Sequence, residues 1–132
     1  MSHNQHPAAP SVIIVDDDEA VLNALQFSLE LDGFAVQTFA DGRALLDRPE
    51  VAARACLVID YHMPALNGLE LLGSLRDRGI AAPAILITAD VSDIVRQRAT
   101  LFGVLVVEKP ALDDLSEKVR DLLAALENSP LL

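Results

Sequence analysis

Short apolar runs alternate with amphipathic segments along most of this 132-residue chain. The runs predict strands, and the segments between them carry apolar residues every three or four positions, as on one face of a helix. The expected strands are 11–15, 34–39, 56–59, 84–87 and 104–107. The expected helices are 19–31, 43–47, one capped by Asn67 and ended before Gly79, one from Ser92 or Asp93 to Leu101, and 113–126. This alternation predicts a parallel sheet with helices on both faces.

The first, third, fourth and fifth runs are nearly unbroken valine, isoleucine and leucine, which is typical of strands buried on both faces. We therefore expect an α/β domain of the flavodoxin-like, doubly wound (βα)5 type, with a five-stranded parallel sheet in the order 2-1-3-4-5. The domain is expected over 11–127, between a flexible polar leader at 1–10 and a short tail at 128–132. Leader and tail together indicate a whole, single-domain protein.

Composition narrows the class of protein. The net charge is −10, from 20 acidic and 10 basic residues, which disfavours direct contact with nucleic acid. No apolar run reaches about 18 residues, so no membrane span is expected, and the first ten residues lack the pattern of a secretory signal. A single cysteine, Cys56, forms no internal disulfide, in keeping with a reducing compartment. We expect a cytoplasmic protein.

Residues suited to phosphate chemistry stand where four of the strands end. Asp16 and Asp17 follow the first strand, Asp60 the third, Thr88 the fourth and Lys109 the fifth. In open α/β sheets, ligands bind at the edge formed by the carboxyl ends of the strands. The expected strand order makes the first and third strands neighbours, so the three acids should meet there. The threonine and the lysine should close the outer side of the same crevice.

This set of residues fits metal-assisted phosphoryl chemistry. Crowded carboxylates repel one another unless a cation relieves the repulsion, and Mg²⁺ prefers oxygen ligands. Asp17 and Asp60 would hold Mg²⁺ (or Mn²⁺), with Asp16 in reach through water. A carboxylate can attack phosphorus, and Lys109 and Thr88 would then neutralise and bind the phosphoryl oxygens. The small Ala89 beside Thr88 leaves room for phosphate to enter.

Four segments, in this order and spacing, carry a resemblance to a known family. They are Val-Asp-Asp-Asp at 15–18, Asp-Tyr-His-Met-Pro-Ala-Leu-Asn-Gly at 60–68, Ile-Thr-Ala at 87–89 and Glu-Lys-Pro at 108–110. Through them the chain resembles a response-regulator receiver domain of bacterial two-component signalling, over about residues 11–127.

The resemblance implies a role for each site residue. Asp60 would take a phosphoryl group from the phosphohistidine of a histidine kinase or histidine phosphotransfer protein. Asp17, Asp60 and the backbone carbonyl of His62 would bind Mg²⁺ directly, and Asp16 through water. Thr88 and Lys109 would hold the phosphoryl oxygens and drive the switch. The resemblance further implies a cis peptide bond before Pro110.

Because 132 residues leave no room for an output domain, we expect the switch to signal through contact with another protein or to pass the phosphoryl group on in a phosphorelay. A homodimer through the fourth helix, fifth strand and fifth helix is a further expectation. Three residues before Lys109 the family usually has Tyr or Phe, whose ring turns inward on activation. This chain has Val106, and a small, stiff valine cannot reproduce that motion. We therefore expect altered coupling between phosphorylation and this face.

Two other functions remain open at this point. A phosphatase of the haloacid-dehalogenase type also begins with an apolar strand ending in Asp-x-Asp, which Asp16 and Asp18 satisfy, and would use Asp16 as nucleophile. The chain lacks the last acid motif of those enzymes after Lys109. A pseudo-receiver would bind a partner without phosphate. The interpretation as a receiver predicts a signalling switch that does not act as a turnover enzyme.

Overall fold

The structure is a computed structural model that describes residues 11–89, 92–109 and 113–127. The expectations for the leader at 1–10, the tail at 128–132 and the peptide bond at Pro110 lie outside these residues.

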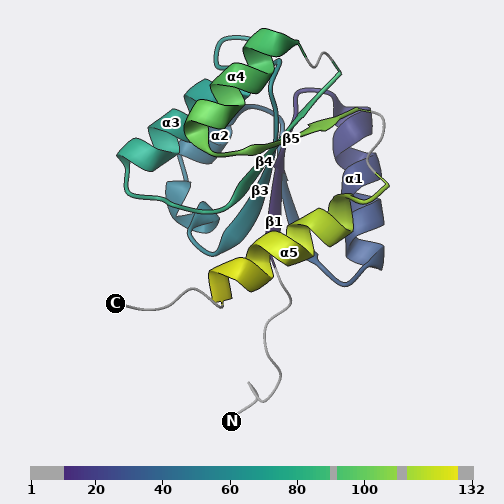
Figure 1. Cartoon of the computed structure of the whole chain (residues 1–132). Coiled ribbons are helices and arrows are strands. Elements are labelled where there is room, and N and C mark those ends of the chain that lie inside the picture. Colours follow the sequence, from purple (N-terminus) through teal and green to yellow (C-terminus); the bar gives the residue numbers. More distant parts are fainter. Residues whose placement is uncertain (1–10, 90–91, 110–112, 128–132) are drawn as a thin grey trace.

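Strands and helices alternate throughout the described residues, as the apolar pattern predicts (Figure 1). The strands are β1 (Ser11–Val15), β2 (Ala35–Phe39), β3 (Ala55–Asp60), β4 (Ala84–Thr88) and β5 (Leu105–Glu108). The helices are α1 (Glu19–Leu31), α2 (Gly42–Leu46), the 3₁₀ helix η2 (Pro49–Ala52), α3 (Gly68–Asp77), α4 (Asp93–Phe102) and α5 (Leu115–Glu127). Most boundaries lie within one or two residues of those expected.

Among the described residues, the strands form a single five-stranded sheet in the order β2-β1-β3-β4-β5. Every pairing is parallel. This confirms the flavodoxin-like fold and its strand order. Because Val15 pairs with Ile59, the residues that follow them, Asp16 and Asp60, emerge side by side at the carboxyl edge of the sheet.

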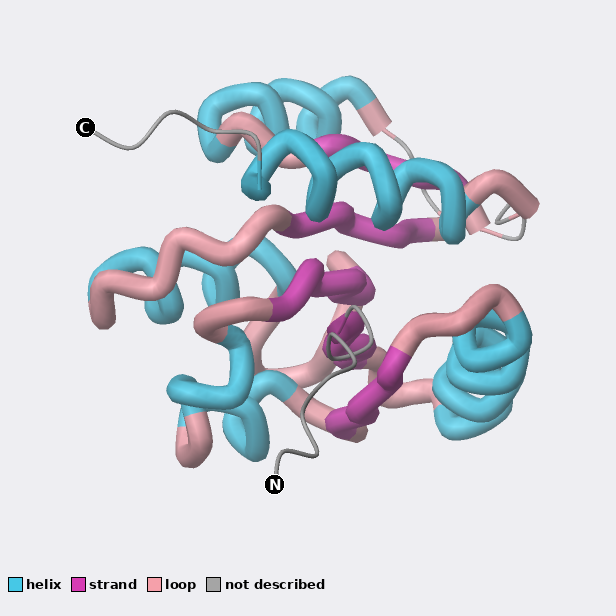
Figure 2. Tube along the Cα trace, turned by 90° about the horizontal axis from the view of Figure 1, so that it is seen from below, coloured by secondary structure: helices cyan, strands magenta, loops and turns pink. Residues whose placement is uncertain are grey.

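Helices cover both faces of the sheet. α2, α3 and α4 lie on one face, and α1 and α5 lie on the other (Figure 1); the view in Figure 2 shows strands with helices on either side. Successive residues of a strand point to opposite faces. In β1, Ile13 and Val15 therefore join the core under α2, α3 and α4, while Val12 and Ile14 join the core under α1 and α5.

The expectation that the fifth strand is buried on both faces is wrong. β5 lies at the edge of the sheet and pairs with β4. Leu105 is 43% exposed, Val106 is half-buried and Val107 is buried. An edge strand has a neighbour on one side, so the helices cover it incompletely. Apolar composition alone does not distinguish such a strand from a central one.

Polar side chains define where the helices begin. The Asp18 carboxylate accepts hydrogen bonds from the first turn of α1, and the Ser92 hydroxyl does the same for α4, as expected from their residue types. Pro49 begins the 3₁₀ helix η2, which follows α2. Within the part of the chain that the structure describes, no helix is long and apolar enough to cross a bilayer.

Candidate functional site

The carboxyl edge of the sheet collects the residues that the sequence singles out. Asp16 and Asp17 directly follow β1, Asp60 ends β3, Thr88 ends β4 and Lys109 follows β5. They meet because the strands are parallel, so that all their carboxyl ends lie at one edge. The sheet topology thus brings four segments that are distant in the sequence together at one edge of the sheet.

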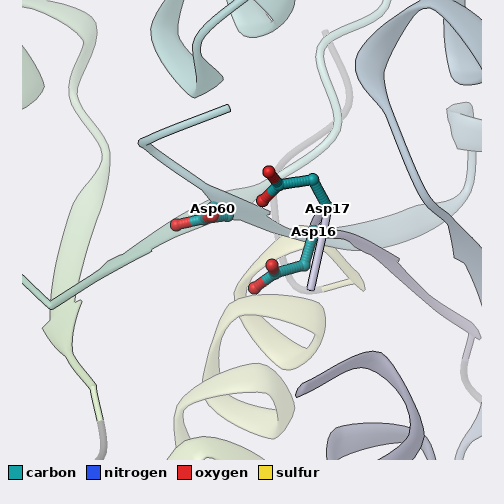
Figure 3. Close-up of side chains that lie close together, drawn as sticks. All are labelled: Asp16, Asp17 and Asp60. Atoms are coloured by element: carbon teal, nitrogen blue, oxygen red, sulfur yellow. The ribbon is translucent and has the colours of Figure 1, made fainter. Parts of the chain in front are cut away.

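The three aspartates form a compact acidic cluster. One carboxylate oxygen from each of Asp16, Asp17 and Asp60 lies within 4.8 Å of the others. Figure 3 shows the side chains next to one another, from the ends of β1 and β3. Asp16 is 0% and Asp60 is 5% exposed, whereas Asp17 is exposed to solvent. The cluster therefore has a buried floor and one open carboxylate.

Lys109 is the cation that faces this cluster. Its Nζ lies 2.8 Å from Asp16 Oδ2 and 3.4 Å from Asp60 Oδ1. Its backbone N–H donates to the Thr88 carbonyl at 2.8 Å, so the end of β4 fixes the lysine at the site. In this structure the shorter ion pair is the one with Asp16.

Both carboxylate oxygens of Asp16 are engaged. Oδ2 accepts from Lys109, and Oδ1 accepts from the backbone N–H of Asp18 at 2.9 Å. Asp18 in turn caps α1 through its own side chain. These bonds orient the buried Asp16 carboxylate and tie the start of α1 to the floor of the site.

Asp60 titrates far from its usual range. Burial and the neighbouring Asp16 charge raise the pKa of Asp60 from 3.8 to about 6, although Lys109 and a backbone hydrogen bond from His62 act in the opposite direction. Burial alone would lower the pKa of Lys109, but its hydrogen bond to Asp16 and the charges of both aspartates raise it. Asp60 is therefore harder to ionise than an ordinary aspartate, and Lys109 stays protonated.

The charge and the donor atoms of the cluster fit a hard divalent cation. With all groups ionised, the three carboxylates exceed the one ammonium by two negative charges. Carboxylate oxygens are the ligands that Mg²⁺ and Mn²⁺ favour. The candidate ligands for such an ion are Asp16, Asp17 and Asp60.

Three further predicted residues border the cluster. The Thr88 side chain is fully buried at the end of β4, and Ala89 beside it is exposed. The His62 side chain is exposed, and its ring packs edge-on against Tyr61 with the ring centroids 4.8 Å apart. The role expected of the His62 backbone carbonyl stays a prediction.

Val106 is the position at which this chain departs from the Tyr or Phe that is usual in the family. It pairs with Leu86 in the sheet register, and its half-buried side chain packs against the core beneath α3 and α4. Its effect on switching stays a prediction.

Two features of the site were not assigned by sequence reasoning. Gly68 is required sterically, since a Cβ atom there would lie 2.6 Å from the carbonyl oxygen of Asp60. Tyr61 meets Arg98 of α4, 37 residues away, with 3.3 Å between its hydroxyl and the arginine Nη1. Gly68 stands directly after the capping Asn67 in the sequence, but the local pattern does not show how closely the Asp60 carbonyl approaches it. The tyrosine contact depends on tertiary packing and left no local signal.

Comparison with known proteins places the chain in a family. A family model described as the response regulator receiver domain matches residues 12–120. The transcriptional regulatory protein FixJ of Azorhizobium caulinodans is 40% identical over 82 residues, covering 62% of this chain and 39% of that protein. The response regulator MprA of Mycolicibacterium vanbaalenii is 35% identical over 116 residues, covering 85% of this chain and 49% of that protein.

Solved structures agree with this match. FixJ-N has a TM-score of 0.81 at 31% identity, covering 96% of this chain and all of that one (100%). A CheY-like response regulator receiver domain protein from Methanospirillum hungatei has a TM-score of 0.83 at 26% identity, covering 91% and 98%. The chain spans 39% and 49% of the two curated relatives, so more than half of each of those proteins lies outside the matched region.

Proposed function

Because this chain belongs to the response regulator receiver domain family, we propose that it is a phosphoryl-accepting signalling switch with Asp60 as the acceptor. The observation that carries the proposal is the acidic cluster of Asp16, Asp17 and Asp60 facing Lys109 at the carboxyl edge of the sheet. Its relatives are response regulators, which are not turnover enzymes.

In the proposed reaction, a carboxylate oxygen of Asp60 attacks the phosphorus of a phosphohistidine. An O–P bond forms and the P–N bond breaks, with its electron pair left on the imidazole nitrogen, which takes a proton from solvent. Lys109 would hold one phosphoryl oxygen by charge, and the Thr88 hydroxyl would donate to another. Hydrolysis of the aspartyl phosphate by water releases inorganic phosphate and restores the carboxylate.

The proposed metal is Mg²⁺, or Mn²⁺ in its place. Asp17, Asp60 and the His62 backbone carbonyl would bind it directly, and Asp16 would act through water. When bound, the ion supplies positive charge that offsets the carboxylates and the incoming phosphoryl oxygens. The excess of two negative charges in the cluster supports a divalent ion.

Asp60 is a better acceptor than Asp16 on structural grounds. Both Asp16 oxygens accept hydrogen bonds, at 2.8 and 2.9 Å, and Asp16 is 0% exposed, whereas Asp60 is 5% exposed and its contact with Lys109 is longer, at 3.4 Å. This disfavours the alternative of a haloacid-dehalogenase-type phosphatase using Asp16. The cluster with its lysine likewise disfavours a pseudo-receiver that binds a partner without phosphate.

The partners follow from the same proposal. The phosphoryl donor would be a histidine kinase or histidine phosphotransfer protein, and output would come from contact with another protein. FixJ is named a transcriptional regulatory protein, and this chain covers 39% of it; we propose no nucleic-acid contact for the acidic domain itself. A homodimer through α4, β5 and α5 remains a proposal, supported by the exposed Leu105 of β5 and Leu126 of α5.

The proposal is tested by incubating the chain with acetyl phosphate and Mg²⁺ and recording its intact mass. The wild type should gain one phosphoryl group, Asp60→Asn should gain none, and the matched control Asp47→Asn, an exposed acid away from the site, should behave as the wild type. Loss in Asp16→Asn but retention in Asp60→Asn would instead indicate the phosphatase-type nucleophile. No gain with any small donor or kinase would indicate a pseudo-receiver.

A further inference from the structure

The residue next to the proposed phosphoryl acceptor makes a polar contact with α4. The Tyr61 side chain is only 7% exposed and belongs to the core on the face covered by α3 and α4. Its hydroxyl accepts a hydrogen bond from Arg98 Nη1 at 3.3 Å. A single side chain thus connects the end of β3, where phosphate would arrive, to a helix.

The tyrosine is held firmly on its own side of this contact. Its backbone N–H donates to the Ile87 carbonyl at 2.9 Å, and its carbonyl accepts from the Gly68 N–H at 2.9 Å. These bonds tie its backbone to β4 and to the start of α3. If the contact between Tyr61 and Arg98 breaks, we therefore expect the movement on the Arg98 side, in α4, and not in the Tyr61 backbone.

α4 is lightly anchored by comparison. Its buried residues are Val95 and Ala99, whereas Ile94 is 60% and Leu101 is 87% exposed. The helix begins at Asp93, shortly after Thr88, which is proposed to bind a phosphoryl oxygen. An element with few buried apolar contacts, and connected closely to the site, is the one that a charge change there can displace.

The hydrogen bond between Tyr61 and Arg98 is of a kind that can break and form again. Tyr61 and Arg98 line an open groove of about 690 Å³ between α3 and α4, together with Leu101 and Phe102. A long hydrogen bond at such an open place has moderate strength. Val106 packs against the same core as Tyr61. Its side chain has no polar atom, so it cannot form a hydrogen bond to Arg98 in place of the Tyr61 hydroxyl.

We propose that the hydrogen bond between Tyr61 and Arg98 holds α4 in its resting position and thereby restrains phosphoryl acceptance at Asp60. This inference rests on the proposed function. A bond that stabilises only the resting state lowers the affinity of the site for any ligand that favours the other state. Loss of the bond therefore strengthens the binding of a phosphoryl mimic.

The test measures beryllofluoride affinity in the presence of Mg²⁺ by calorimetry. Tyr61→Phe keeps the ring and removes the hydroxyl, and it should bind about two- to tenfold more tightly than the wild type, as expected for one hydrogen bond of moderate strength. Arg98→Ala should show the same gain, and the double variant should show no further gain. Arg96→Ala, an exposed arginine on the same helix, should leave the affinity unchanged.

The outcomes separate the two proposals. If the wild type binds beryllofluoride but Tyr61→Phe and Arg98→Ala bind it equally or more weakly, the restraint does not exist while phosphoryl acceptance stands. Additive gains in the double variant would also contradict it, because the residues would then act independently. If the wild type neither binds the mimic nor gains a phosphoryl group, the proposed function fails and this inference fails with it. Arg98→Ala changes an exposed side chain, so the test does not depend on how well Tyr61→Phe folds.

Discussion

Asp60 is a buried acid that shares one lysine with a second buried acid. Lys109 lies closer to Asp16 than to Asp60, so the charge of Asp60 is only partly balanced. Burial and then the Asp16 charge raise the pKa of Asp60 to about 6, and Lys109 offsets them only in part. At neutral pH the ionised Asp60 carboxylate therefore lowers the stability of the metal-free fold, and a bound cation would offset this effect.

The pH dependence of stability follows with a definite sign. The folded protein holds the Asp60 proton to a pKa of about 6 and the unfolded chain to its ordinary value of 3.8, so Asp60 lowers the free energy of unfolding as pH rises through this window. Without Mg²⁺, Asp60→Asn should be more stable than the wild type at pH 8, by on the order of 2 kcal/mol. The difference should vanish only well below pH 3.8, where Asp60 is protonated in both the folded and the unfolded protein.

Urea unfolding of both proteins at several pH values measures this difference. Asp47→Asn, at an exposed position, serves as the control and should show no comparable gain. A wild type that is as stable as Asp60→Asn at pH 8 would mean that folding does not raise the pKa of Asp60.

At the residue scale, the sequence could predict identities but not distances. The types and order of the four site segments sufficed to single out the acids, the threonine and the lysine. Lys109 pairs with two aspartates, and Asp16 is completely buried. Both features depend on the register of β1 against β3 and on the packing of α1. No local pattern encodes those, nor the contact between Tyr61 and Arg98.

At the element scale, α3 is fixed against the site by its first turn. Asn67 and Glu70 form a reciprocal cap in which each side chain accepts from the other's backbone N–H, both at 2.9 Å. Gly68 then lets the helix start against the Asp60 carbonyl. The start of α3 and the end of β3 therefore move as one piece.

Two alanine substitutions on α3 should act in opposite directions. Gly68→Ala places a Cβ atom 2.6 Å from the Asp60 backbone oxygen, so the backbone must shift; we expect a loss of about 2 kcal/mol in the free energy of unfolding. Gly73→Ala meets only the Phe102 ring at 3.7 Å. It should stabilise the helix by about 0.5–1 kcal/mol, because alanine favours helices over glycine.

Chemical denaturation of the two variants checks this pair. If both substitutions changed the free energy of unfolding equally, the start of α3 would not be in close steric contact with the end of β3. Gly73→Ala also serves as the control for a general effect of alanine substitution on α3, because Gly73 lies on the same helix.

Element types and order were predictable because the hydrophobic periods of strands and helices differ. The caps at Asp18, Asn67 and Ser92 were predictable because their side chains bond to nearby backbone. The exposure of β5 was not predicted, since its apolar run resembles those of the central strands. The 3₁₀ helix that begins at Pro49 was not predicted either, because proline starts a helical turn as readily as it ends one.

At the scale of the whole molecule, stability and ligand binding are linked. The cluster of Asp16, Asp17 and Asp60 exists only in the fold, so an ion that binds there stabilises the folded state. At ten times its dissociation constant, such an ion adds about 1.4 kcal/mol, or about 3–6 °C in Tm for a domain of this size. Mg²⁺ should therefore raise the Tm.

The change should shrink in Asp17→Asn, which removes the exposed ligand of the cluster while leaving the buried floor in place. Asp41→Asn, an exposed acid that caps α2, is the control and should keep the full response to Mg²⁺. Thermal scans at millimolar Mg²⁺ measure the effect. A flat response in the wild type would contradict a metal site at this edge.

The whole-molecule architecture was the part most accessible to prediction. Parallel strands joined by helices admit few topologies, and the placement of acids at several strand ends favours the order that brings them together. The order β2-β1-β3-β4-β5 and the match over residues 12–120 agree with that expectation. The docking partner and the face that it contacts could not be predicted, because the exposed apolar residues of such a surface show no periodic pattern in the sequence.

The central claim is that Asp60, and not Asp16, forms the phosphoryl bond. The most direct measurement is to phosphorylate the chain with acetyl phosphate and Mg²⁺, reduce the acyl phosphate with borohydride, and locate the resulting homoserine by peptide mass mapping. The account predicts homoserine at position 60 alone. Homoserine at position 16, or at neither aspartate in a protein that has gained a phosphoryl group, would contradict it.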